Sequence, residues 1–143
     1  MALQTTFTPI ALVDLHDEAA RRKVAGWRFV EMHGVRVDAG NDLYYAFMKD
    51  GMLDNVKVES VPHEAPVPSV TDVFLGAFVF ENETRELFQA NIQDIAIDYD
   101  GDMYTLAEQA PMNFISPEQK AAKDKARKIA RAKEAKALSL IHI

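Results

Sequence analysis

The chain has 143 residues, of which 48% are hydrophobic, and a formal net charge of -6. These values fit one globular domain with a modest core and exclude an intrinsically disordered chain. Cysteine is absent, which excludes disulfides, thiol catalysis and iron–sulfur clusters or zinc held by cysteines of this chain. No apolar run is long enough to span a bilayer, and the first residues lack the pattern of a secretory signal, so we expect a cytoplasmic protein.

The first half of the sequence predicts a helix followed by a meander of three strands. Asp14 is a suitable N-cap for a helix over residues 15–25, after which Gly26 stands where helices often end. Residues 27–61 are rich in aromatic and β-branched residues, which alternate with polar ones at residues 56–59 and follow one another on both faces at residues 43–48. Turns are expected at residues 40–42, Gly-Asn-Asp, and at residues 50–51, Asp-Gly.

Prolines interrupt regular structure over residues 62–68, and Ser69 is a good N-cap for a following helix. That helix would continue through FVFENETRELFQ, residues 78–89, where apolar side chains recur on one side. Residues 92–109 predict a hairpin that turns at Asp100-Gly101.

The C-terminal segment differs in charge from the rest of the chain. Residues 118–137 hold eight Lys or Arg against three acids, a charge of +5, so the remaining residues carry -11. Ser116, followed by Pro, Glu and Gln, predicts the start of a helix. Ile129 is the one large apolar residue of this helix before Leu138. We therefore expect a solvated basic helical or disordered tail over residues 118–143, after a folded domain over residues 1–117.

Three glutamates in residues 78–89 are candidates for catalysis or metal binding. On a helix, Glu81 and Glu83 point about 160° apart and cannot serve one site. Glu83 and Glu86 can share a face, and Glu81 stands four residues before Arg85, in the favourable order for an ion pair. No histidine lies at the spacing of a di-metal carboxylate site. The pattern favours a solvated or docking face, with a metal ligand or a general acid or base as the alternative.

The remaining motifs give weaker indications of a catalytic or binding site. The sequence DYDGD, residues 98–102, has its glycine too early for an EF-hand and Gln109 in place of the last acidic ligand, so a turn is favoured over weak cation binding. The histidines show no zinc spacing, and His33 is expected in the core or on the surface of a sheet. Glycine-rich phosphate loops and a nucleophile elbow are absent.

Two motifs together resemble the 30 kDa subunit family of respiratory complex I (NADH dehydrogenase) and its relatives in energy-converting, membrane-bound hydrogenases. The first motif is Pro-Ser-hydrophobic-Thr, matched at residues 68–71. The second is Glu-x-Glu-x-x-acid-hydrophobic-Phe-Gly, matched at residues 81–88. Asn82 replaces an arginine of the family pattern, Gln89 replaces its glycine, and a downstream His-Pro element is missing. The resemblance covers roughly residues 15–98 and favours the short, hydrogenase-associated version.

The resemblance implies an α+β fold, with a small, mostly antiparallel sheet packed against two or three helices and a basic C-terminal helical tail. It implies an accessory subunit, with no catalytic site and no cofactor of its own, of an oxidoreductase complex in electron transport. The complex would lie on the cytoplasmic side of the membrane, and this chain would reach the membrane only through its partners. Those partners would be a large catalytic subunit and an iron–sulfur subunit, which would hold the iron–sulfur clusters and the nickel or quinone site. The signature residues, read as subunit-interface positions, are Pro68, Ser69, Thr71, Glu81, Glu83, Arg85, Glu86 and Phe88.

Two other functions remain alternatives. The basic C-terminal helix could make the chain a stand-alone module that binds nucleic acid, anionic lipid or an acidic protein. The carboxylates could instead belong to an enzyme or a metal-binding protein. The accessory subunit is the preferred interpretation, and under it nucleic acid is not a partner.

Overall fold

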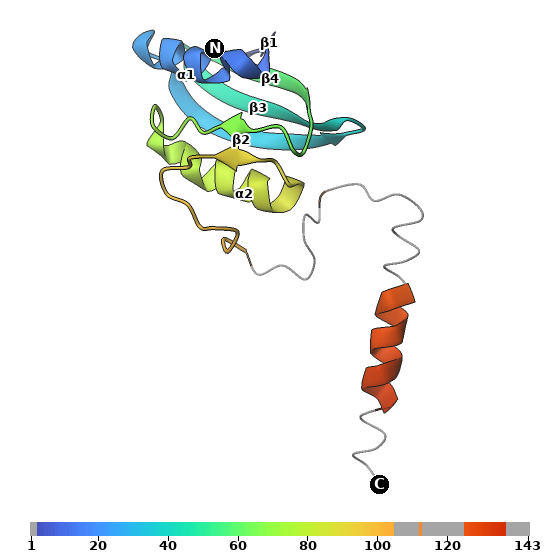
Figure 1. Cartoon of the computed structure of the whole chain (residues 1–143). Coiled ribbons are helices and arrows are strands. Elements are labelled where there is room, and N and C mark those ends of the chain that lie inside the picture. The colour runs from blue at the N-terminus through green and yellow to red at the C-terminus, as the bar shows by residue number, and fades with distance from the viewer. Residues whose placement is uncertain (1–2, 105–111, 113–124, 137–143) are drawn as a thin grey trace. The chain divides into compact units, whose positions relative to one another are not determined.

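A computed structural model describes residues 3–104, 112 and 125–136 of the chain (Figure 1). The chain divides into two units, Met1–Asn113 and Phe114–Ile143. The described part of the second unit is a helix over residues 125–136, whereas the predicted helix start at Ser116 lies outside the described residues.

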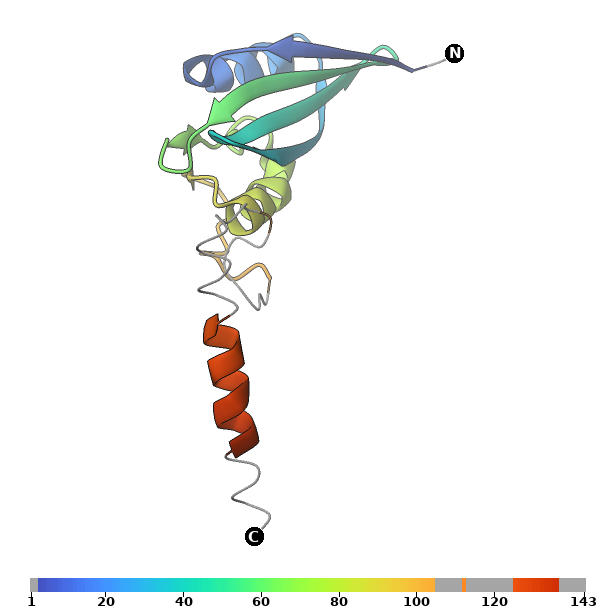
Figure 2. The ribbon, with the colours of Figure 1, turned by 90° about the vertical axis from the view of Figure 1, so that its right-hand side faces the viewer.

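The first unit is built on a four-stranded sheet with the order β1-β4-β3-β2 (Figure 2). Its strands are β1 (Gln4–Pro9), β2 (Arg28–Val37), β3 (Gly40–Lys49) and β4 (Met52–Val61). Neighbouring pairs among β2, β3 and β4 are antiparallel, and β1 pairs with β4 in parallel. The predicted α+β class with a mostly antiparallel sheet is confirmed. Strand β1 was not predicted.

Of the two turns predicted in the meander, one is confirmed and one is wrong. Asp50 and Gly51 have φ values of 50° and 75°, as a tight hairpin turn requires, so this turn is confirmed. The turn predicted at residues 40–42 is wrong, because the chain reverses at residues 38–39 and Gly40 already pairs with Val37. Gly40 is needed for another reason. Its φ is 149°, and a Cβ there would lie 2.0 Å from the carbonyl oxygen of Val61.

Helix α1 (Leu15–Val24) follows a short 3-10 turn, η1 (Leu12–Asp14), and confirms the first predicted helix. Gly26 beyond its end has a φ of 86°, where a side chain would be strained. Asp14 occupies the N-cap position without a side-chain cap bond.

Helix α2 (Phe78–Phe88) follows the 3-10 turn η2 (Leu75–Ala77). The prediction of a helix from Ser69 onward is wrong, because the α-helical phase begins nine residues later, at Phe78. Ser69 lies in the loop after β5 (Val67–Pro68).

The hairpin predicted over residues 92–109 is not formed by its described part. Strand β6 (Ile92–Gln93) pairs with β5 in parallel. Residues 94–104 form a loop that contains the predicted Asp100-Gly101 turn.

Both helices of the first unit cover the same face of the sheet. Leu43, Tyr45 and Phe47 of β3 alternate toward this face and are almost completely buried. Helix α1 lies beside β1 and β4, and α2 lies beside β2 (Figure 1). Gly34 of β2 allows α2 to approach closely, since a Cβ there would lie 3.3 Å from the Thr84 side chain.

A candidate subunit-signature site

The two signature motifs meet at Glu81. This residue lies in the first turn of α2, and its side chain is fully buried. One carboxylate oxygen accepts a hydrogen bond of 2.6 Å from the Ser69 hydroxyl, and the other accepts a bond of 2.8 Å from the Val70 N–H. The loop between β5 and η2 is thereby attached to the beginning of α2.

A chain of hydrogen bonds extends this attachment to the segment after β6. The Ser69 and Thr71 hydroxyls lie 2.6 Å apart. Because the Ser69 hydroxyl donates to Glu81, the Thr71 hydroxyl donates to Ser69. Thr71 Oγ1 also accepts a bond of 2.8 Å from the N–H of Ala96. We call Ser69, Thr71 and Glu81 the glutamate clamp.

The clamp places a carboxyl group in an apolar interior. Burial raises the pKa of Glu81 above its ordinary value, while the hydrogen bonds from Ser69 and Val70 oppose this shift. The neighbouring Tyr45 hydroxyl is buried and has no hydrogen-bond partner among the described residues. Burial, with a contribution from the charge of Glu81, raises the pKa of Tyr45 well above its usual range. Since Glu81 is fully buried and hydrogen-bonded inside the chain, its geometry suits a structural role rather than acid–base chemistry on a substrate.

Asn82, which replaces the arginine of the family pattern, organises the loop after β6. It is fully buried, and its amide group donates to the carbonyls of Phe78 and Ile97 at 2.7 and 2.9 Å. Its oxygen accepts from the N–H of Tyr99 at 3.1 Å and from Arg85 at 3.0 Å. All four hydrogen-bonding positions of the amide are used inside the chain.

Arg85 does not form the ion pair with Glu81 that the sequence spacing predicted. Its guanidinium group instead donates to both carboxylate oxygens of Asp98, one of them at 3.0 Å. The hydrogen bond from Arg85, followed by one from the N–H of Asp100, lowers the pKa of Asp98 to about 2. The prediction was wrong because the Glu81 side chain points inward and binds the loop at residues 69–70. Arg85 binds Asp98 instead.

Glu83 and Glu86 share a face of α2, as predicted, and both hold residue 104. Glu86 is largely buried and accepts from the N–H groups of Met103 and Tyr104 at 2.9 and 3.0 Å. Glu83 accepts from the Tyr104 hydroxyl at 2.8 Å, on the exposed side. The outward face of the helix is therefore partly occupied by the chain's own loop.

Pro68 and Phe88 stand at the ends of the two motifs. Pro68 pairs with Gln93 in the short parallel ladder of β5 and β6. Phe88 ends α2, and its carbonyl accepts a bond of 3.0 Å from the Asn41 side chain. The next residue, Gln89, is left-handed with φ 58° and ψ 33°. This conformation explains why a glycine suits that position.

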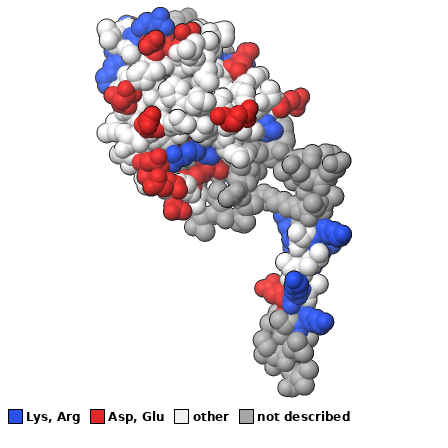
Figure 3. All heavy atoms as spheres, viewed as in Figure 1, with Lys and Arg blue, Asp and Glu red and all other residues white. Residues whose placement is uncertain are grey.

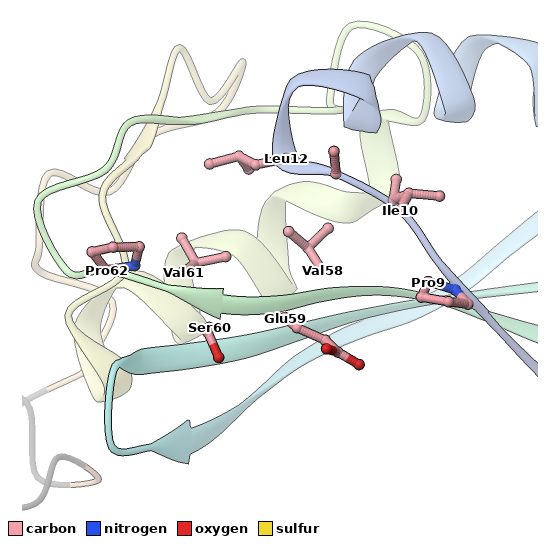
Figure 4. Close-up of a pocket in the computed structure, with 9 residues that line it drawn as sticks. Pro9, Ile10, Leu12, Val58, Glu59, Ser60, Val61 and Pro62 are labelled. Atoms are coloured by element: carbon pink, nitrogen blue, oxygen red, sulfur yellow. The ribbon is translucent and has the colours of Figure 1, made fainter.

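Other candidate chemistry finds no support within the described residues. They contain no group of three or more potential metal-ligating side chains. His33 lies on the sheet surface, stacked on Tyr44 with the ring centroids 4.9 Å apart. One hollow of about 340 Å³ lies between η1 and the end of β4 (Figure 4). Most of the residues that line it are apolar, such as Leu12 and Val61, and the side chains of its polar residues Glu59 and Ser60 point away from Leu12.

Three residues that hold this region together were not among the predicted site residues. Asn82, Asp98 and Tyr104 form hydrogen bonds with the predicted residues Arg85, Glu83 and Glu86. Only Asn82 carried a signal, because asparagine is a poor residue for a helix interior and its presence there indicates a tertiary role.

Comparison with known proteins gives a structural likeness only. No protein-family model matches the chain, and no curated protein matches it by sequence. The fold is similar to that of a chain in the membrane-bound sulfane sulfur reductase, an archaeal respiratory membrane complex. The TM-score is 0.67 at 16% sequence identity, over 85% of this chain and 78% of that one. The two chains share a fold. No helix in the described part of this chain is long and apolar enough to cross a membrane.

Proposed function

We propose that this chain is an accessory subunit, without a catalytic site of its own, of a membrane-associated respiratory oxidoreductase related to complex I and the energy-converting hydrogenases. The observation that carries the proposal is the likeness of its fold, over most of the chain, to a chain from an archaeal respiratory membrane complex. The signature motifs supply independent support, because their two halves form one bonded unit at Glu81.

In this role the signature residues divide into two groups. Ser69, Thr71 and Glu81 are buried and fix the loop before α2. Glu83 and Arg85 of the same helix are more accessible than these three, and a large catalytic subunit would dock on the part of the surface that contains Glu83. The partners would be that large subunit and an iron–sulfur subunit, which would hold the redox cofactors.

Affinity purification of the tagged full chain from membranes of its native host tests the proposal. We expect a complex I-like or hydrogenase-like large subunit and an iron–sulfur subunit to be recovered with it. A chain that purifies alone, while the neighbouring genes are expressed, would contradict the proposal.

A pair of charge-reversal variants tests where the partner docks. Glu83→Arg should reduce recovery of the large subunit at least several-fold, because it reverses a charge on the outward side of α2. Asp17→Arg, the same charge change at an exposed position on α1, should leave recovery unchanged. Both melting temperatures are measured, since equal recovery by two folded variants would remove α2 from the interface.

A further inference from the structure

The helix over residues 125–136 presents charge opposite to that of the rest of the chain. It contains six basic residues and one acid, Glu134, which gives it a charge of +5. All twelve residues are exposed. Basic side chains are visible along it, whereas acidic side chains are spread over the first unit (Figure 3). The basic residues are Lys125, Arg127, Lys128, Arg131, Lys133 and Lys136.

One side of this helix combines lysines with its only large apolar residue. Ile129 is 48% exposed. Lys125 and Lys133 stand four residues before and after it, and Lys136 stands seven residues after it, so all three share its side of the helix. Arg127 and Arg131 point about 160° away from Ile129.

We propose that this side of the helix binds anionic lipid headgroups at the membrane surface. Lysine ammonium groups would contact lipid phosphates while their aliphatic stems and Ile129 enter the headgroup layer. A nucleic acid offers the same phosphates, but binding to its phosphate backbone would not bury an exposed isoleucine between lysines. The helix also contains no aromatic residue on which bases would stack.

The contact would act as an electrostatic tether. Residues 1–117 carry a charge of -11, so an anionic surface would repel them. The helix over residues 125–136 would supply the attraction. A few basic residues give reversible binding that weakens with salt. The inference rests on the proposed function, which places the chain at a membrane, and it adds a direct lipid contact to the contact made through partner subunits.

Co-sedimentation of the purified full chain with vesicles tests the inference. We expect binding to vesicles that contain phosphatidylglycerol, weaker binding at high salt, and none to pure phosphatidylcholine vesicles. The triple variant Lys125→Gln, Lys133→Gln, Lys136→Gln should bind about 100-fold more weakly, because each lysine near an anionic surface contributes roughly a fivefold factor.

A matched variant tests whether binding depends on the side of the helix that carries Ile129 or only on the number of basic residues. Arg127→Gln, Lys128→Gln, Arg131→Gln removes the same charge from elsewhere on the helix and should weaken binding about tenfold or less. Ile129→Ser should weaken vesicle binding and leave binding to a single-stranded oligonucleotide unchanged.

Three results would overturn the inference: no binding to anionic vesicles at low salt, equal losses in the two triple variants, or tighter binding to the oligonucleotide than to the vesicles. Any of them would leave the proposed function standing if the native-host purification still recovers the partner subunits.

Discussion

Burial and hydrogen bonding act on the carboxylate of Glu81 in opposite directions. Burial raises its pKa, and the donors at Ser69 and Val70 favour the charged form. Both donors are themselves buried. A buried hydrogen-bonding group that loses its partner costs about 1–3 kcal/mol, so the clamp makes the folded state depend on this one side chain.

Replacing Glu81 with alanine should therefore destabilise the protein by about 3 kcal/mol, because the Ser69 hydroxyl and the Val70 N–H would both lose their acceptor. The same replacement at Glu83, whose bond to Tyr104 is exposed, should cost about 0.5 kcal/mol or less. Urea unfolding at neutral pH measures both. Similar losses in the two variants would show that the clamp adds no stability of its own.

The ion pair of Arg85 with Asp98 predicts a pH dependence. The pKa of Asp98 falls from 3.8 to about 2 on folding. The folded protein therefore binds this proton less tightly than the unfolded chain. The stabilisation it supplies is present above pH 3.8 and is lost as the pH falls toward 2.

Asp98→Asn should be less stable than the wild type at neutral pH, and the difference should shrink as the pH falls through this window. Denaturant unfolding of both proteins between about pH 6 and pH 2 measures the difference. A difference that stays constant across the range would show that Arg85 does not lower the pKa of Asp98.

At the residue scale, the sequence predicted correctly those features that depend on local helix geometry. It failed for side chains whose hydrogen-bond partners lie far away in the sequence. The helical spacing correctly separated Glu81 from Glu83. The pairing of Glu81 with Arg85 failed because Ser69, twelve residues before Glu81, is the better partner for a buried carboxylate. Asn82 departs from the family pattern at its position, yet its amide binds the backbone at residues 97 and 99.

At the scale of elements, helix α2 ends in a conformation that costs free energy. Gln89 is left-handed, a region where residues other than glycine are strained by about 1 kcal/mol. Gln89→Gly and Gln89→Ala both remove the side chain, so the comparison isolates the backbone. The glycine variant should be more stable than the alanine variant by about 1 kcal/mol in thermal or urea unfolding. Equal stabilities of the two variants would indicate that residue 89 leaves the left-handed conformation in the alanine variant.

The elements that were predicted correctly carry their own local signals. The meander is rich in aromatic and β-branched residues, and Asp50-Gly51 has the chemistry of its turn. Strand β1 has no such signal, because its sequence QTTFTP is mostly exposed and it pairs in parallel with β4, a strand far along the chain. The predicted hairpin failed because α2 engages the backbone and carboxylate groups of residues 97–99, which hold this segment as a loop.

At the scale of the whole molecule, the described residues form one hydrophobic core, on one face of the sheet. In the described part of the chain, both helices of the first unit pack on the face of Tyr45, and the opposite face carries Phe7, which is 62% exposed. Val35 of β2 is also 43% exposed.

Membership of this chain in a respiratory membrane complex is tested most directly by solubilising native-host membranes in mild detergent, separating the extract by size, and quantifying the tagged chain in each fraction. We expect the chain to elute with the large catalytic and iron–sulfur subunits in a constant ratio. Elution at the mass of the free chain, 16.0 kDa, while the large subunit elutes elsewhere in an intact complex, would contradict it.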